Sequence, residues 1–240
     1  MKTSNKILLG SLVFIMLLFT AIQVGLYAKY KKGEFVTIEQ LHEEGYDRHV
    51  IAGITKVEVS GLGSLEIIPS DTLRVDIERA NAKQSDITYK QKGDVLTING
   101  GLTFINSKGE KEISRSNTSV VIYMPSNISV NFTDCNVRFN GGKDTTHSFS
   151  HTIMATNSDV RLGDWRGNEK DLSYFGTIAF MGNGGSIEFL QGASFKELNL
   201  TLTDNEMNDQ GFNAEKIVLN MDEKSNITLK GSNLKKALNK

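Results

Sequence analysis

The 240-residue chain has one cysteine, Cys135, and two prolines. A single cysteine permits no intramolecular disulfide, so the stability of the fold must come from burial and backbone pairing. We expect Cys135 to be a small buried hydrophobe rather than a reactive thiol. Scarce proline leaves the backbone N–H groups of strands free to pair, and 22 glycines supply the permissive φ that turns require.

The chain also lacks a surplus of charge and any familiar catalytic motif. Its 27 Lys and Arg against 28 Asp and Glu give a net charge of −1, which excludes the basic surface that binding to nucleic acid requires. No G-x-S-x-G, P-loop or H-E-x-x-H pattern occurs. We therefore expect no enzyme activity, no cofactor and no nucleic-acid partner.

One long apolar run is present, from Ile7 to Tyr27. It contains no charged side chain, and as a helix it would span roughly 30 Å, the thickness of the hydrocarbon core of a bilayer. We assign residues 1–6 to a short tail and residues 7–28 to a transmembrane helix or uncleaved signal anchor. A cleaved signal peptide is the alternative, but the best cleavage site, Leu26-Tyr27-Ala28, has a bulky Leu where a small residue is needed.

The lysines that flank the run bear on its orientation. Lys2 and Lys6 precede it and three lysines follow it, so the distribution of positive charge does not decide the orientation. A short basic tail before a first hydrophobic segment is the usual arrangement of an export signal. We expect a protein anchored in the lipid bilayer through residues 7–28, with its main domain outside the cytoplasm, in the periplasm or at the cell surface.

Residues 29–50 have the character of a juxtamembrane linker. Thr37 and Gln40 have capping-box spacing and Gly45 is a suitable C-terminal stop, which predicts one short helix from Ile38 to Glu44. A mobile stalk is the alternative. We assign residues 51–232 to one β domain and residues 233–240 to a C-terminal tail.

From Ile54 onward the apolar residues alternate with period two. The segments KVEVS, SLEIIPS, LRVDIER, DITYKQ and DVLTING are separated by turn-forming residues, a pattern that is typical of consecutive strands. The segment SNTSVVIYMPSN is apolar enough to be a strand that is buried on both faces.

A short motif then repeats: an aliphatic residue, a variable residue, and Phe or Leu. Its eight copies begin at Val130, Val137, Val160, Ile178, Ile187, Leu198, Ile217 and Ile227. In a strand, the first and third residues of each triplet would point inward and the middle one outward. One triplet cannot bury its apolar pair alone, so coils stacked about 4.8 Å apart are needed to build a continuous core. We therefore predict an all-β fold of parallel solenoid type. An antiparallel β-sandwich or jelly roll is the alternative, but it gives no reason for one repeated triplet.

The segment ITKVEVSGLGSLEIIPSDTLRVDIE, followed by DVLTING, NSDVRL and GGSIEFL, resembles the auto-transporter adhesin head family of β-solenoid envelope proteins, also called the GIN domain. The likeness covers roughly residues 54–231. It implies a right-handed parallel β-helix at the cell envelope. It carries over no functional residue, because the family has no catalytic motif to match.

The outward middle residues of the triplets give a candidate binding face. Taken as one column, they read Asn131, Arg138, Arg161, Ala179, Glu188, Asn199, Val218 and Thr228. This column has no carboxylate pair of the kind that a glycosidase needs. We place a binding site at Arg138, Arg161, Trp165 and Arg166, because Arg and Trp are common in binding hot spots. An aromatic lid over the core is the alternative role for Trp165.

Two groups of residues raise the question of a metal ion. His147 and His151 flank Phe149, and in a strand all three would share a face, but a solvated pair is favoured over a zinc site because further ligands are not evident. The segment Asp204–Gly211 is acidic and loop-like but lacks the EF-hand order, so a plain turn is favoured over a calcium site. We predict no metal.

Two classes of function follow. We expect a membrane-anchored, non-enzymatic envelope protein with a structural or adhesive role that binds a glycan or an envelope protein. An envelope polysaccharide lyase or hydrolase on a β-helix scaffold is the alternative.

Overall fold

The computed structural model describes residues 3–32, 45–78, 87–105, 111–164 and 172–238. The chain divides into two compact units, Met1–Gly45 and Tyr46–Lys240. The first contains one helix, α1, from Thr3 to Lys31, with solvent-exposed residues at every position from Leu9 to Lys32. By its length and composition, the span Leu9–Lys31 is long and apolar enough to cross a membrane. This confirms the predicted apolar helix, which is compatible with either an anchor or a signal sequence.

The second unit is built almost entirely of strands, which confirms the all-β prediction. In chain order they are β1 (Tyr46–Val50), β2 (Lys56–Ser60), β3 (Leu62–Pro69), β4 (Arg74–Glu78), β5 (Thr88–Lys92), β6 (Val95–Asn99), β7 (Leu102–Ile105), β8 (Lys111–Ser114), β9 (Ser116–Met124), β10 (Ser129–Thr133), β11 (Asn136–Phe139), β12 (Phe149–Leu162), β13 (Ser173–Phe189), β14 (Ala193–Thr203), β15 (Glu206–Asp209), β16 (Asn213–Met221) and β17 (Asn226–Thr228). An eight-residue helix, α3 (Gly231–Leu238), follows.

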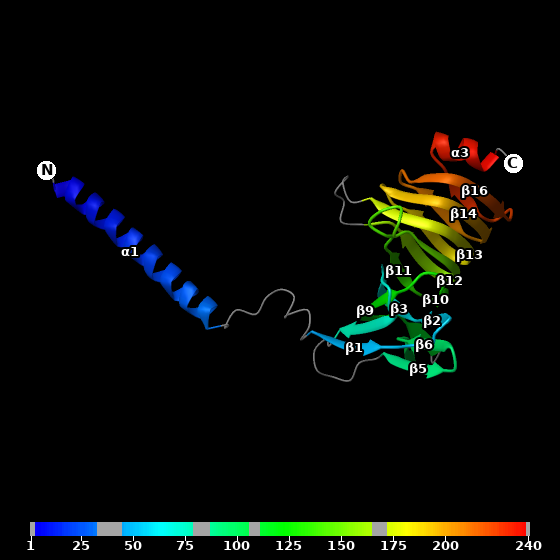
Figure 1. Cartoon of the computed structure of the whole chain (residues 1–240), viewed down its shortest axis with the longest axis horizontal. Helices are drawn as coiled ribbons and strands as arrows, with labels where there is room; N and C mark the ends of the chain where they lie inside the picture. Colours follow the sequence, from blue (N-terminus) through cyan, green and yellow to red (C-terminus); the bar gives the residue numbers. More distant parts are fainter. Residues whose placement is uncertain (1–2, 33–44, 79–86, 106–110, 165–171, 239–240) are drawn as a thin grey trace. The chain divides into compact units, whose positions relative to one another are not determined.

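Fifteen of these strands form one sheet that curls into an open half-barrel, while β7 and β8 pair separately (Figure 1). The sheet mixes parallel and antiparallel pairs, so the structure does not show a complete right-handed β-helix. Nor does it show the two packed antiparallel sheets of the alternative, because the repeated triplets pair in parallel. The first and last strands in the order, β1 and β5, approach each other where His49 Nδ1 and Tyr89 Oη lie 3.0 Å apart.

The repeated triplets lie in two stacked columns rather than one. Both β12 and β13 are long enough to contribute to each column. In the first column, the triplets that begin at Ile178, Leu198 and Ile217 stack in register. The triplet that begins at Val130 pairs with Ile153-Met154-Ala155 and is displaced by two residues, because Ile153 is the register partner of Phe180. The second column contains the triplets that begin at Val137, Val160, Ile187, Met207 and Ile227. Each strand therefore pairs with the equivalent strand of the preceding and following turn of the chain.

Burial confirms the predicted orientation of the triplets. The inward residues of the predicted copies from Val130 to Leu200 are at most 1% exposed, whereas their middle residues are half-buried or exposed. Complete burial of one large aliphatic side chain stabilises the folded state by about 1.5–3 kcal/mol. Residues Val120 to Ile122 of β9 are also buried, which confirms a strand covered on both faces.

Between the first column and the second, the chain turns at a residue whose backbone has the left-handed conformation. Because Ser60, Thr133, Thr156, Asn183 and Thr203 lie in register, the residues that follow them also stack. These corner residues all have positive φ: Gly61, Asp134, Asn157, Gly184 and Asp204. Asp and Asn tolerate this conformation better than other residues with a Cβ. Three of the five corner positions are accordingly occupied by Asp or Asn rather than by Gly.

The ends of the domain differ from the boundaries that the sequence suggested. Strand β1 lies within the segment assigned to the linker and pairs antiparallel with β4. The predicted helix Ile38–Glu44 lies outside the described residues. Within the segment 233–240, which was assigned to a tail, α3 continues to Leu238 and buries Asn233. A helix of eight residues is unstable alone and forms here by docking on the sheet, which a local pattern does not reveal.

The corner at Asn157 provides a test of this architecture. Asn157 has a φ of 49° and is exposed, so its replacement changes the backbone preference with little loss of packing. We expect Asn157→Val to lower the free energy of unfolding in urea by about 1–2 kcal/mol, the cost of left-handed backbone at a residue with a Cβ. The matched variant Asn157→Gly should stay within about 0.5 kcal/mol of the parent. Equal stability of the two variants would contradict a left-handed corner.

Candidate functional site

The structure brings two of the predicted site residues together. Arg138 of β11 and Arg161 of β12 are register partners on adjacent parallel strands. They lie in an outward row of the second column that we call the polar ladder. Its members are Glu66, Arg138, Arg161, Glu188, Asn208 and Thr228. Adjacent strands are about 4.8 Å apart, so the ladder holds its side chains at a regular spacing.

The prediction that all the outward triplet residues form one column is wrong. Asn131, Ala179, Asn199 and Val218 lie in the first column, on the other side of the corner residues. The sequence gives the spacing of the triplets but not which of them pair. Glu66 belongs to the ladder because β11 pairs with β3 as well as with β12. This pairing joins segments that are distant in the sequence, so no local motif predicts it.

The side chains of the ladder hold one another in place. The Nε atom of Arg161 lies 2.9 Å from Oε2 of Glu188, and Gln210 donates a hydrogen bond of 2.8 Å to Oε1 of the same carboxylate. At the other end, Asn140 donates to Glu66. The side chain of Arg161 is 41% exposed, so the ion pair adds at most about 1 kcal/mol to stability. Its main effect is to fix the direction of the guanidinium.

A second set of polar contacts flanks the ladder. Arg115 lies 3.1 Å from Asp159 and donates to the carbonyl oxygen of the corner residue Asn157. Ser186, on the next strand, donates to the other oxygen of Asp159 at 2.8 Å. The face therefore holds positive side chains, negative side chains and hydrogen-bonding groups in fixed positions. Such an arrangement is suited to recognising a polar partner. Sequence reasoning did not include Arg115 or Asp159.

The other two predicted site residues, Trp165 and Arg166, lie outside the described residues. The structure thus places Arg138 and Arg161 side by side. The part played by Trp165 and Arg166 in the binding face stays a prediction.

The two histidines considered as metal ligands do not share a face. His147 precedes β12 in an exposed turn, where its Nδ1 lies 2.8 Å from Oδ1 of Asp144. Hydrogen bonds from Thr146 and His147 hold the pKa of Asp144 well below its usual range. His151 is instead buried, with Nδ1 hydrogen-bonded to the carbonyl oxygen of Ile128 and its ring packed against Phe139. The common-face prediction is wrong because the strand begins only at Phe149.

The acidic segment Asp204–Gly211 is not a loop. Glu206–Asp209 is strand β15, and Asp209 is buried at an inward position. Its two oxygens accept four hydrogen bonds, from the backbone N–H groups of Gly211, Phe212 and Lys230 and from the side chain of Asn233. Asp209 thus ties α3 to the sheet. Among the residues that the structure describes, no group of three or more His, Cys, Asp or Glu could hold a metal ion.

Cys135 is fully buried, as predicted. Burial raises the pKa of its thiol above the usual value, and the sulfur contacts the carbonyl oxygens of Thr133 and Val59. The thiol is therefore disfavoured as a nucleophile.

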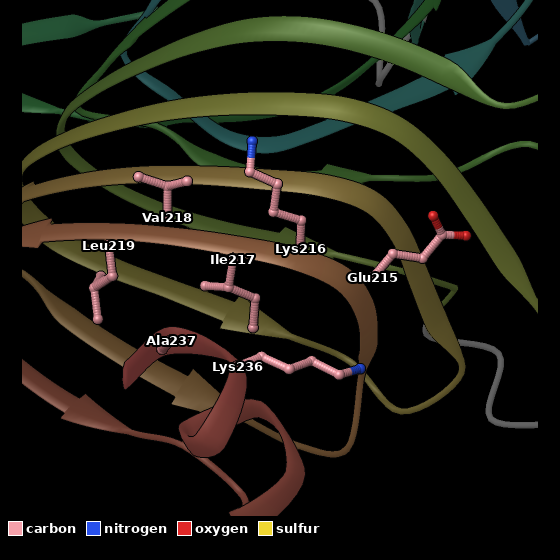
Figure 2. Close-up of a pocket in the computed structure, with 7 residues that line it drawn as sticks. All are labelled: Glu215, Lys216, Ile217, Val218, Leu219, Lys236 and Ala237. Atoms are coloured by element: carbon pink, nitrogen blue, oxygen red, sulfur yellow. The ribbon is translucent and has the colours of Figure 1, made fainter. Parts of the chain in front are cut away.

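A second candidate site lies at the C-terminal end of the sheet. Here an apolar groove of about 570 Å³ separates α3 from the last strands. A neighbouring hollow of about 370 Å³ shares Leu219 and Ala237 with it and adds the polar side chains of Glu215, Lys216 and Lys236 (Figure 2). The sequence could not indicate either hollow, because both depend on the unpredicted helix.

Comparisons with known proteins add little. No family model matches the chain, and no curated protein matches it. Two crystal structures show distant similarity. One is named "Putative lipid binding protein from Parabacteroides distasonis", with 12% identity, a TM-score of 0.32, and coverage of 73% of this chain and 77% of that one. The other is named "a putative cell adhesion protein from Clostridium sporogenes", with 13% identity, a TM-score of 0.27, and coverage of 76% and 99%. TM-scores this low do not establish a shared fold, and no family model confirms the GIN-domain resemblance.

His151 makes the stability of the domain depend on pH. Burial lowers its pKa from 6.5 to about 4 in the folded protein. The unfolded chain therefore binds a proton at a pH where the folded protein does not, and stability falls as the pH drops from about 6.5 to about 4, by on the order of 3 kcal/mol. We expect His151→Gln, which keeps a donor for Ile128, to remove this part of the pH dependence in urea titrations. The exposed control His147→Gln should retain it, and a slope unchanged in His151→Gln would contradict the assignment.

Proposed function

We propose that this chain is a membrane-anchored β-solenoid protein of the cell envelope whose β domain lies outside the cytoplasm and acts by binding rather than by catalysis. The observation that carries the proposal is the polar ladder, in which adjacent parallel strands hold Arg138, Arg161 and Glu188 in register. Binding surfaces benefit when their side chains are ordered before the partner arrives, because less entropy is lost on association.

The solenoid part of the proposal is supported by the stacking of equivalent segments. Successive turns of the chain pair in parallel through both columns, and their corner residues share the left-handed conformation. Such nearest-neighbour stacking is the defining feature of repeat architectures. The antiparallel strands β1, β4 and β5 then serve as additions to one end of the stack.

The membrane part is supported by α1. Its residues from Leu9 to Lys31 are all exposed within the unit that they form. An exposed helix with an apolar span of this length is stabilised by a bilayer. The basic tail with Lys2 and Lys6 favours an inside N-terminus, which would place the β domain outside the cytoplasm.

For the partner we propose a glycan or another envelope protein, bound at Arg138 and Arg161 together with Trp165 and Arg166. Guanidinium groups donate several hydrogen bonds in a fixed plane to hydroxyl and carboxylate oxygens, and they stack on flat surfaces. The exposed half of the Arg161 side chain remains available, although Glu188 anchors its Nε atom.

The alternative of a polysaccharide hydrolase finds less support in this face. Glu66 and Glu188 lie in the same row but are separated by three strand spacings, about 14 Å. Glycosidases hold their two carboxyl groups about 5–9.5 Å apart. Both oxygens of Glu188 are also engaged, by Arg161 and Gln210.

The anchor can be tested by fractionation. Because α1 contains the charge-free run Ile7–Tyr27, we expect the full-length protein to remain in the membrane fraction after high-salt and carbonate washes. Protease added to intact cells should remove the β domain. Soluble protein whose mature N-terminus is Lys29 would contradict the anchor and favour a cleaved signal.

The binding face can be tested by substitution. We expect Arg161→Ala combined with Trp165→Ala to weaken capture on a glycan array, or of solubilised envelope proteins, by about tenfold or more. The control Lys196→Ala changes an exposed residue on β14, away from the ladder, and should have no effect. Circular dichroism would verify folding of each variant. Undiminished capture by the double variant would remove this face from consideration.

A further inference from the structure

The stack of strands ends with its core incompletely covered. Leu219, Ile227 and Leu229 belong to the last turn of the chain and are only partly buried, although the equivalent residues of earlier turns are almost fully buried. Beside them Met221 is 48% exposed and Leu238 of α3 is 73% exposed. Since no further strand follows β16 and β17 in the described sheet, this end offers apolar surface to a partner.

The uncovered surface is concave. The groove of about 570 Å³ lies between α3 and the last strands, and the described residues that line it are all Leu, Ile, Met or Ala. Its volume falls within the range of about 300–1,000 Å³ that is typical of small-molecule sites. None of the described lining residues has a hydrogen-bonding side chain, so the groove favours the apolar part of a ligand.

A positive charge lies in the hollow that adjoins the groove, near the start of β16. In the adjoining hollow, Lys216 is paired with Glu197 at 2.7 Å. Lys236 instead donates to the carbonyl oxygen of Ala214 and to the side-chain oxygen of Asn213, so these partners in the described part of the chain are neutral. Figure 2 shows its side chain extending from α3 away from Ala237, the residue that both hollows share, toward the side of Glu215. Glu215 lines the same hollow, but the hydrogen-bond partners of the Lys236 ammonium group in the described part of the chain are these two neutral oxygens.

We propose that this groove binds a single-chain anionic amphiphile, with the acyl chain against the apolar lining and the acidic head group near Lys236. The apolar lining matches the acyl chain, and the positive charge at the far end of the adjoining hollow matches the acidic head group, so the ligand would extend across both hollows. An added β-strand fits less well, because Lys236 already occupies the carbonyl oxygen of Ala214 on β16, and α3 lies against that strand. The proposal is independent of the binding face, because Arg138 and Arg161 lie on the earlier strands β11 and β12.

The test uses residues 46–240, because this unit holds the whole described core and α1 contributes no buried residue from Leu9 onward. The probe is cis-parinaric acid, a long-chain fatty acid whose fluorescence rises in an apolar site, titrated below its micelle concentration. We expect saturable binding of one molecule per domain. The corresponding alcohol, which lacks the negative charge, should bind more weakly.

Two substitutions locate the site. Leu238→Glu adds a carboxylate at an exposed position of the lining and should weaken binding of the fatty acid by about tenfold or more. Lys236→Gln should weaken binding of the acid but not of the alcohol. The matched control is Val50→Glu on β1, a residue that is 75% exposed and lies at the other end of the sheet. Thermal unfolding would establish that each variant is folded.

Several results would overturn the proposal. These are the absence of saturable binding, equal binding by Leu238→Glu and Val50→Glu, and equal loss of acid and alcohol binding in Lys236→Gln. Binding to anionic vesicles without binding of the monomeric acid would identify a docking surface for a bilayer instead. A doubled mass in light scattering that Leu238→Glu abolishes, again without acid binding, would identify a second copy of the chain as the occupant. None of these results would bear on capture by the polar ladder.

Discussion

The in-register parallel pairing of successive turns of the chain determines the other features of the β domain. This pairing satisfies the backbone groups and at the same time aligns the inward residues of each triplet, so that Phe180 lies next to Leu200 and Ile187 next to Met207. The outward residues are aligned by the same register, which is why Arg138, Arg161 and Glu188 form a ladder. A shift of one residue would exchange core and surface. The core and the candidate binding face therefore depend on the same hydrogen bonds.

A stack of this kind must also protect its two ends, and the chain does so differently at each. Near the N-terminal end, β4 and β1 extend the sheet antiparallel from β9, and β5 does so from β6. At the C-terminal end a short helix covers part of the last turn. Asp209 lies at an inward position, in register with Phe189 of the preceding turn. It accepts a hydrogen bond from Asn233 of this helix. The chain thus uses a position in the core to attach α3. Because α3 covers only part of the last turn, the apolar groove remains beside it.

Much of the domain could be predicted from local pattern, because the alternation of apolar residues depends only on which side chains are buried. The inward residues follow from it, whereas the burial of β9 follows from its continuous apolar run and that of Cys135 from the hydrophobic character of a free cysteine. The pairing of the triplets could not be predicted, since Ile153-Met154-Ala155 and Met207-Asn208-Asp209 occupy equivalent positions without matching the motif. The helix α3 is stabilised by contacts distant in sequence, such as Asn233 with Phe212. Features that rest on long-range pairing leave no local signal.

The register itself can be measured by cysteine cross-linking. Met181 and Thr201 are exposed register partners on β13 and β14, and in-register residues of adjacent strands lie within the Cα separation that a disulfide tolerates. The buried Cys135 should not compete. The account predicts rapid disulfide formation under mild oxidation in the folded double variant Met181→Cys/Thr201→Cys, and slow formation in Met181→Cys/Thr203→Cys, which is displaced by two residues. Equal rates in the two variants, or a faster rate in the second, would contradict the parallel in-register stack.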